Sequence, residues 1–118
     1  MKYLLLIYGD EQALGDAERQ RCYGESAHLV NNLKASGRFL ATAPLHDTPT
    51  AISVRVRGGK RLVTDGPFAE TREQLGGFFL VDVQDREEAI GIAARIPGAA
   101  RGTVEVRPVV ELANLPEE

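Results

Sequence analysis

Along this chain, segments with the hydrophobic pattern of strands alternate with segments that have the hydrophobic pattern of helices. The short apolar run Tyr3–Tyr8 stops at Gly9 and predicts a strand over Lys2–Tyr8. Asp16 is the expected N-cap of a helix that continues to about Ser36. On a helical wheel, one face of that helix collects six residues, namely Cys22, Tyr23, Ser26, Leu29, Val30 and Leu33.

The middle of the chain predicts a β-hairpin. Apolar and polar side chains alternate over residues 52–57, which is typical of a half-buried strand. Gly58-Gly59 supplies the positive φ angles of a two-residue turn, so that Lys60–Thr64 returns beside the first strand. In this register Ile52 lies opposite Asp65, which places a carboxylate on the apolar side of the hairpin.

Four further elements complete the pattern. Arg38–Ala43, Phe78–Val83 and Thr103–Val110 each predict a strand. Asp85, with Glu88 three residues later, is a capping signature that starts a second helix. The residues that this helix is expected to bury are Ala89, Ile90, Ala93 and Ile96.

This order of elements predicts an α+β fold: a ferredoxin-like antiparallel sheet with two helices on one face and an inserted β-hairpin. Residues 1–112 are expected to form this single domain, and residues 113–118 a flexible acidic tail. A chain of 118 residues fits one domain, and it is long enough to bury a core without disulfides or a structural metal.

Two of the predicted strands are apolar on both faces. Residues 4–7 and 78–81 are all hydrophobic, whereas a sheet that is wet on one side alternates apolar with polar residues. Two helices cover one face only, and an exposed apolar sheet is unusual in a monomer. We therefore expect a homodimer that packs open sheet face against open sheet face around a two-fold axis. The alternative is that loops or the hairpin fold over this face.

Composition narrows the classes of function. The net charge of −3 gives no electrostatic footprint for nucleic acid, and no apolar stretch is long enough to cross a membrane. No secretion signal is visible, so a cytoplasmic location is expected. One cysteine, Cys22, and two histidines at unrelated spacings predict neither a disulfide nor a metal site, and no organic cofactor is implied.

Several segments resemble one known family. Val63–Thr71, which contains Asp65-Gly66-Pro67-Phe68, and the following Glu73–Phe78 closely resemble the YCII-related family in its DGPF-motif branch. Lys2–Gly9 and Val104–Pro108 resemble the two ends of that family. The resemblance implies a dimeric α+β barrel. It also implies a bacterial protein, with the association to alternative sigma factors that is common in this branch.

The resemblance also implies a site around His28. Some members carry a proposed His–Asp pair, and the stretch around His28 resembles the one that holds the histidine. The family's aspartate stands before a proline where this chain has Ile96, so Asp65 is the better candidate partner. A carboxylate on one ring nitrogen would fix the tautomer of His28 and favour proton transfer. The alternative is a solvated surface histidine, because His28 points away from the apolar stripe.

Four residues are expected to border a ligand pocket with this pair: His46, Gly66, Pro67 and Phe68. The alternative for Gly66-Pro67 is a purely structural turn in which Asp65 bonds nearby amides. Likewise, His46 is otherwise a surface residue of its loop.

Two hypotheses of function follow. In the first, the chain is an enzyme or binder for a small molecule, lactone-like or enolisable, with His28 and Asp65 as the acid/base groups. In the second, it is a non-catalytic dimeric module that binds a transcription factor or a small signal.

Overall fold

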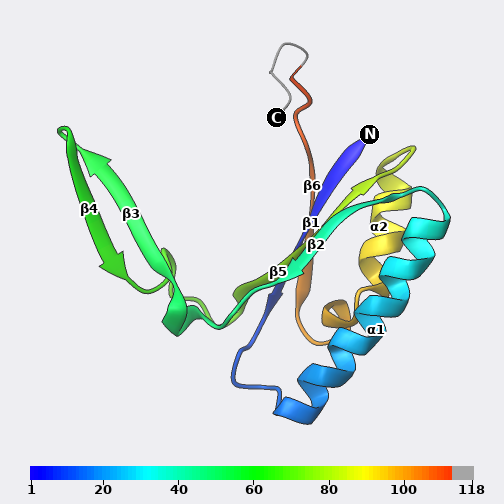
Figure 1. The fold of residues 1–118 in the computed structure, drawn as a ribbon, viewed down its shortest axis with the longest axis horizontal. Coiled ribbons are helices and arrows are strands. Elements are labelled where there is room, and N and C mark those ends of the chain that lie inside the picture. The colour runs from blue at the N-terminus through cyan, green and yellow to red at the C-terminus, as the bar shows by residue number, and fades with distance from the viewer. Residues whose placement is uncertain (113–118) are drawn as a thin grey trace.

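Four strands and two helices make a two-layer body, from which a two-stranded hairpin projects (Figure 1). The structure is a computed structural model and describes residues 1–112, so the acidic tail expected at 113–118 lies outside the described residues. The elements in chain order are β1 (Lys2–Gly9), α1 (Asp16–Ala35), β2 (Phe39–Pro44), the 3₁₀ turn η1 (Thr48–Thr50), β3 (Ile52–Arg57), β4 (Lys60–Asp65), β5 (Gln74–Asp82), α2 (Arg86–Arg95), the 3₁₀ turn η2 (Pro97–Ala100) and β6 (Thr103–Pro108).

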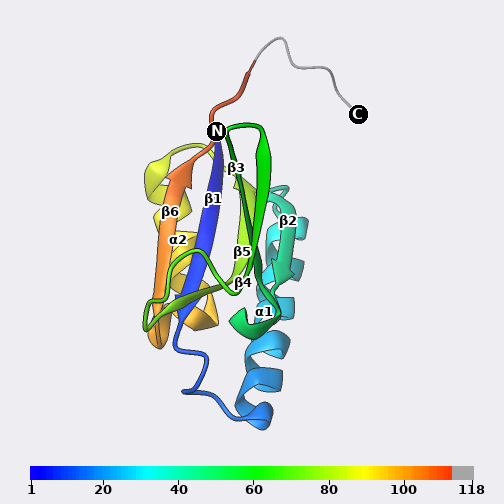
Figure 2. The ribbon, with the colours of Figure 1, turned by 90° about the vertical axis from the view of Figure 1, so that its left-hand side faces the viewer.

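The main sheet has the strand order β2-β5-β1-β6, and each neighbouring pair is antiparallel. Both helices lie on the same face of it, so the predicted α+β, ferredoxin-like arrangement is confirmed (Figures 1 and 2). The apolar runs of β1 and β5 pair with each other at the centre of this sheet.

The core lies between the two central strands and the helices. Leu5 and Val81 are fully buried there, and the helices add residues at the spacing of one helical face. The buried helical residues are Leu29 and Leu33 from α1, and Ala89, Ile92, Ala93 and the C-cap Ile96 at α2. The expectation that Ile90 is buried is wrong: its side chain is 37% exposed, because the stripe of α2 runs through 89, 92, 93 and 96.

The ends of the helices follow the sequence signals closely. The Asp85 carboxylate accepts a hydrogen bond of 2.8 Å from the Glu88 amide, so the predicted cap of α2 is confirmed. The N-cap of α1 is Gly15 instead of Asp16, and Asp16 sits in the first turn, where its charge complements the helix dipole.

Close contact between β2 and β5 explains a glycine in the sheet. An added Cβ at Gly77 would lie 3.0 Å from the Ala43 carbonyl oxygen.

The sheet face that the helices leave uncovered is apolar. Residues directly opposite each other in antiparallel strands share a face, and here the pairs are hydrophobic. We call this surface the open face; its half-buried members are Leu4, Leu6, Ala41, Ala43, Phe78 and Leu80. The face becomes charged at the β6 edge, with Glu105 opposite Leu6 and Arg107 opposite Leu4, and at the end of the central strands, where Lys2 lies opposite Asp82.

The hairpin of β3 and β4 stands away from the body, on the side opposite the helices (Figures 1 and 2). Its register is the predicted one, with Ile52 opposite Asp65 and Val54 opposite Val63. Gly58 and Gly59 both have positive φ angles, as the turn requires. The hairpin does not fold over the open face within this chain, so that alternative for covering the face does not apply.

Candidate functional site

A cavity of about 630 Å³ opens at one end of the two-layer body. The N-terminal half of α1 forms one wall, and the sheet forms the floor at the end of β1, the end of β2 and the start of β5. The turn η2 closes a third side. Its size and largely apolar lining are those of a typical small-molecule site.

Small side chains on α1 create this space. The stripe of α1 that faces the sheet carries Leu29 and Leu33 in its second half, and both are buried in the core. One and two turns earlier, the same stripe carries Ser26 and Cys22, which line the cavity instead of filling it. The N-terminal half of α1 therefore leaves a gap above the sheet.

Two glycines, one in η2 and one just after it, allow this segment to pack closely against β1. A Cβ at Gly98 would lie 2.7 Å from the Ile7 Cγ2 atom, and a Cβ at Gly102 would overlap the carbonyl oxygen of Tyr8. Any side chain at Gly102 would force the backbone of β6 away from β1, since the obstructing atom belongs to the main chain. These glycines fix the closed side of the cavity.

Polar residues gather at the mouth. The Glu11 carboxylate accepts hydrogen bonds from the Thr48 amide (2.8 Å) and the Thr48 hydroxyl (2.6 Å). The Arg19 guanidinium donates to the Asp47 carboxylate at 3.1 Å and to the Glu11 carbonyl oxygen at 3.4 Å. The loop after β1, the start of α1 and the loop before η1 are thereby joined around the opening.

His28 and Asp65 do not meet within one chain. His28 is exposed on α1 and does not line the cavity. Asp65 ends β4 and is exposed on the hairpin, which lies on the other side of the sheet from α1 (Figure 1). A proton relay between them therefore stays a prediction, and it would need a second copy of the chain to bring the two side chains together.

The other predicted site residues divide between the mouth and the hairpin. His46 is exposed, although its neighbours Leu45 and Asp47 both line the cavity. Phe68 is 81% exposed, its ring centre lies 5.5 Å from the Arg55 guanidinium, and it does not line the cavity.

The turn after β4 has a clear structural role. Gly66 has a φ of +104°, a conformation that favours glycine, and Pro67 follows it. The Gly66 amide donates to the Ala51 carbonyl oxygen at 2.7 Å, and its own carbonyl oxygen accepts from the Ser53 hydroxyl at 2.8 Å. These bonds fasten the base of the hairpin.

Sequence reasoning missed the residues that make the cavity. Arg19 and Asp47 come from segments 28 positions apart, and no local pattern joins them. One signal was available: the apolar stripe of α1 changes from leucines to the small Cys22 and Ser26 toward its N-terminus. When the side chains on the buried face of a helix become smaller toward one end, they predict a space between that end of the helix and the sheet.

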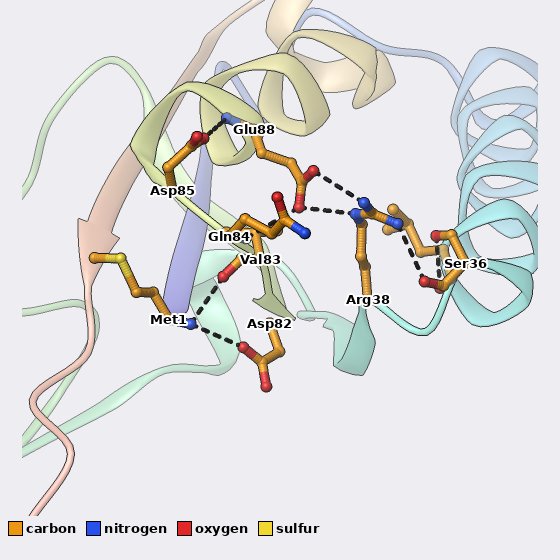
Figure 3. A network of polar contacts seen from close by, with 9 residues as sticks. Met1, Ser36, Arg38, Asp82, Val83, Gln84, Asp85 and Glu88 are labelled. Carbon is orange, nitrogen blue, oxygen red and sulfur yellow. Dashed lines mark hydrogen bonds and ion pairs between the residues drawn. The ribbon is translucent and has the colours of Figure 1, made fainter.

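The opposite end of the body carries a polar network (Figure 3). Arg38 makes a two-pronged ion pair with Glu88, at 2.8 and 3.0 Å. This hydrogen bonding lowers the pKa of the Glu88 carboxyl and raises the pKa of the Arg38 guanidinium. The terminal ammonium of Met1 bonds the Asp82 carboxylate at 3.0 Å and the Val83 carbonyl oxygen at 2.8 Å.

Metal and membrane sites have no structural support in the described part of the chain. Among residues 1–112, no three side chains of His, Cys, Asp or Glu gather closely enough to hold a metal ion. None of the helices described there combines the length and hydrophobicity that crossing a membrane would need.

Comparison with known proteins gives the family. The profile of the YCII-related domain matches residues 1–113. An uncharacterized protein of Rhizobium meliloti (strain 1021) is 35% identical in an alignment of 114 residues, and the match covers 92% of each chain. The family match extends over β1 to β6, hairpin included, and agrees with the resemblance to the YCII-related family seen in the sequence. The chain belongs to the YCII-related family.

Proposed function

We propose that this protein binds a small, largely apolar organic molecule in the cavity between α1 and the sheet. The observation that carries the proposal is the cavity itself: an open space of about 630 Å³ with a largely apolar lining and polar side chains at its mouth. Such a site gains affinity from the burial of apolar surface and gains orientation from a few polar groups at the rim.

The polar groups at the mouth of the cavity narrow the class of ligand. The Arg19 guanidinium and the Asp47 carboxylate face each other at 3.1 Å, so together they present a donor and an acceptor side by side. A molecule with one polar group, such as a carboxylate, a ketone or a lactone carbonyl, would place that group at Arg19 and its hydrocarbon part inside. This class includes the lactone-like or enolisable compounds expected from the sequence.

Binding without catalysis is the better supported form of this function. The acid/base hypothesis needs His28 beside Asp65, and the two stand on separate parts of a single chain. This separation favours a module that senses a small molecule. Asp65-Gly66-Pro67-Phe68 supports a place in the DGPF-motif branch, and through it the proposal of a sigma factor as the macromolecular partner.

The working unit in this proposal is a homodimer that covers the open face. Six apolar side chains on that face are half-buried in one chain and would be shielded from water by a second copy. Association would remove apolar area worth about 25 cal/mol per Å² before its entropic cost.

Thermal-shift screening with small carboxylic acids, cyclic ketones and lactones tests the proposed binding. A compound that raises the melting temperature of the wild type is tested again on Ser26→Leu, which fills the cavity. The matched control is Glu25→Leu, which adds the same side chain at the neighbouring exposed position of α1.

Loss of the shift in Ser26→Leu, with the shift kept in Glu25→Leu, is the expected result. Equal shifts in both variants would place the ligand elsewhere. The acid/base alternative is tested in the same series, because it alone requires that His28→Ala or Asp65→Asn change ligand turnover.

A further inference from the structure

The hairpin gathers exposed hydrophobic residues that no other element of the described chain covers. On one of its faces, four aliphatic side chains are more than half exposed: Ile52 (63%), Val54 (58%), Val56 (62%) and Val63 (56%). We call these four residues the hairpin apolar face. At the two ends of this face lie Asp65, opposite Ile52, and Arg61, opposite Val56. The other face carries Ser53, Arg55, Arg57, Lys60 and Thr64, with Leu62 as its one aliphatic residue. A hairpin that faced only water would have no reason to be apolar on one side.

The surface area of the whole chain points the same way. A compact monomer of 12.8 kDa exposes about 6,300 Å². This chain exposes 8595 Å². Residues 113–118, even if counted at the full surface of an unfolded segment, account for no more than about 950 Å² of the difference. More than about 1,300 Å² is left, and a stable interface needs roughly 800 Å² from each partner.

Charge selects the kind of partner. The hairpin, Ile52–Asp65, holds four basic residues and one acidic residue, a net charge of +3. The rest of the chain holds ten basic and sixteen acidic residues, a net charge of −6. The hairpin of one copy is therefore attracted to the body of another copy, and complementary charge of this kind favours encounter and register.

We propose that the hairpin is an arm that packs its apolar face onto a second copy of this chain, which returns the contact with its own arm. A two-fold axis makes the two contacts identical and closes the assembly at two chains. Each arm stands off on the side of its own open face, so a second copy placed against that face comes within reach of the arm (Figures 1 and 2). The turn at Gly66 and the carboxylate of Asp65, at the base of the arm, are then covered by the partner.

This inference, like the proposed function, requires a homodimer, but it does not depend on the cavity. It assigns to the hairpin a contact with the partner that a dimer formed through the open face alone would not require. The two ideas are separable, because the open face and the arm are altered by different substitutions.

Sedimentation velocity over a dilution series, on the full chain, tests the arm. Val63→Asp puts a charge into the hairpin apolar face. Thr64→Asp is the matched control, because it adds the same charge one residue away on the opposite face of the same strand. Far-UV circular dichroism of each variant verifies that the body is folded, and the arm lies outside the core on which that fold depends.

The expected result is a dimer for the wild type and for Thr64→Asp, with a dissociation constant raised at least about 30-fold by Val63→Asp, because a buried carboxylate would lack a partner. Added salt also weakens the wild-type dimer. Equal dimerisation of the two variants would overturn the arm and leave an open-face dimer intact. A monomeric wild type, or a hairpin that binds anionic vesicles or nucleic acid in place of a second copy, would overturn the arm as well.

Discussion

The two-layer body and the hairpin are built from similar aliphatic residues, yet they differ in what surrounds those residues. In the body, Leu5 and Val81 are completely buried by the helices of the same chain. In the hairpin, Ile52 and Val56 are more than 60% exposed, and β3 and β4 pair only with each other. A two-stranded hairpin alone in water is marginally stable. The comparison teaches that the helices of this chain cover one face of its main sheet, whereas nothing in a single chain covers the aliphatic side chains of the hairpin; the proposed arm contact would supply that cover.

The sharpest contrast comes from truncating one aliphatic side chain in each region. Leu5→Ala removes a fully buried side chain and should lower the free energy of unfolding by about 2–5 kcal/mol. Val54→Ala, at a 58% exposed position, should cost less than about 0.5 kcal/mol while the chain is monomeric. Urea denaturation at low protein concentration measures both. A similar cost at the two sites would contradict the distinction between the regions.

Close backbone packing between β1 and the segment before β6 is a second feature of the body. Gly102→Ala should destabilise the body by about 1–3 kcal/mol, because its Cβ would overlap the Tyr8 carbonyl oxygen. Gly24→Ala is the control: no atom lies within 4 Å of the added Cβ, and the residue is inside α1. That change should stabilise by about 0.5–1 kcal/mol, because alanine is the better helix former. If Gly102→Ala melted with the wild type, β6 would not be held against β1 as described.

A smaller effect is expected at the start of α2. Asp85→Ala removes the acceptor of the Glu88 amide and should cost about 1 kcal/mol. Asp85→Asn keeps an acceptor oxygen and should lose far less. Thermal unfolding of the two variants distinguishes the cap from the charge; equal losses would mean that the charge, and not the hydrogen bond, matters here.

The smallest effect concerns pH at the closed end of the body. Arg38 lowers the pKa of Glu88, so the pair stabilises the fold above the ordinary carboxyl pKa of 4.5, and this contribution is lost as the pH falls through the lower folded-state value. The melting temperatures of wild type and Glu88→Gln should therefore differ at pH 7 and converge toward pH 3. A difference that does not change with pH would exclude the ion pair as its source.

Local features of the fold were predictable from the sequence because local chemistry determines them. Gly58-Gly59 between alternating strands set the hairpin register, and Asp85 with Glu88 set the start of α2. Ile90 was placed in the core wrongly, because a wheel drawn from one apolar run cannot fix the rotation of α2 against the sheet. Where the hairpin points, and whether it covers the open face, depends on contacts that no local pattern contains.

The candidate site was harder to predict than the fold. Arg19, Asp47 and Gly102 meet only because β1, β2 and η2 end at the same edge of the body. The chemistry that sequence patterns favoured, His28 with Asp65, relied on residue type and family resemblance. Residue type says nothing about distance, and a single chain keeps these two side chains on different elements.

The most direct test of the account is amide hydrogen exchange as a function of protein concentration. It asks whether the hairpin needs a second copy of the chain to be protected, while the central strands of the body do not. At high concentration, the amides of β3 and β4 should be protected along with those of β1 and β5. On dilution below the dissociation constant of the dimer, protection of the hairpin should collapse while the central strands keep theirs. Hairpin protection that does not change with dilution would contradict the account.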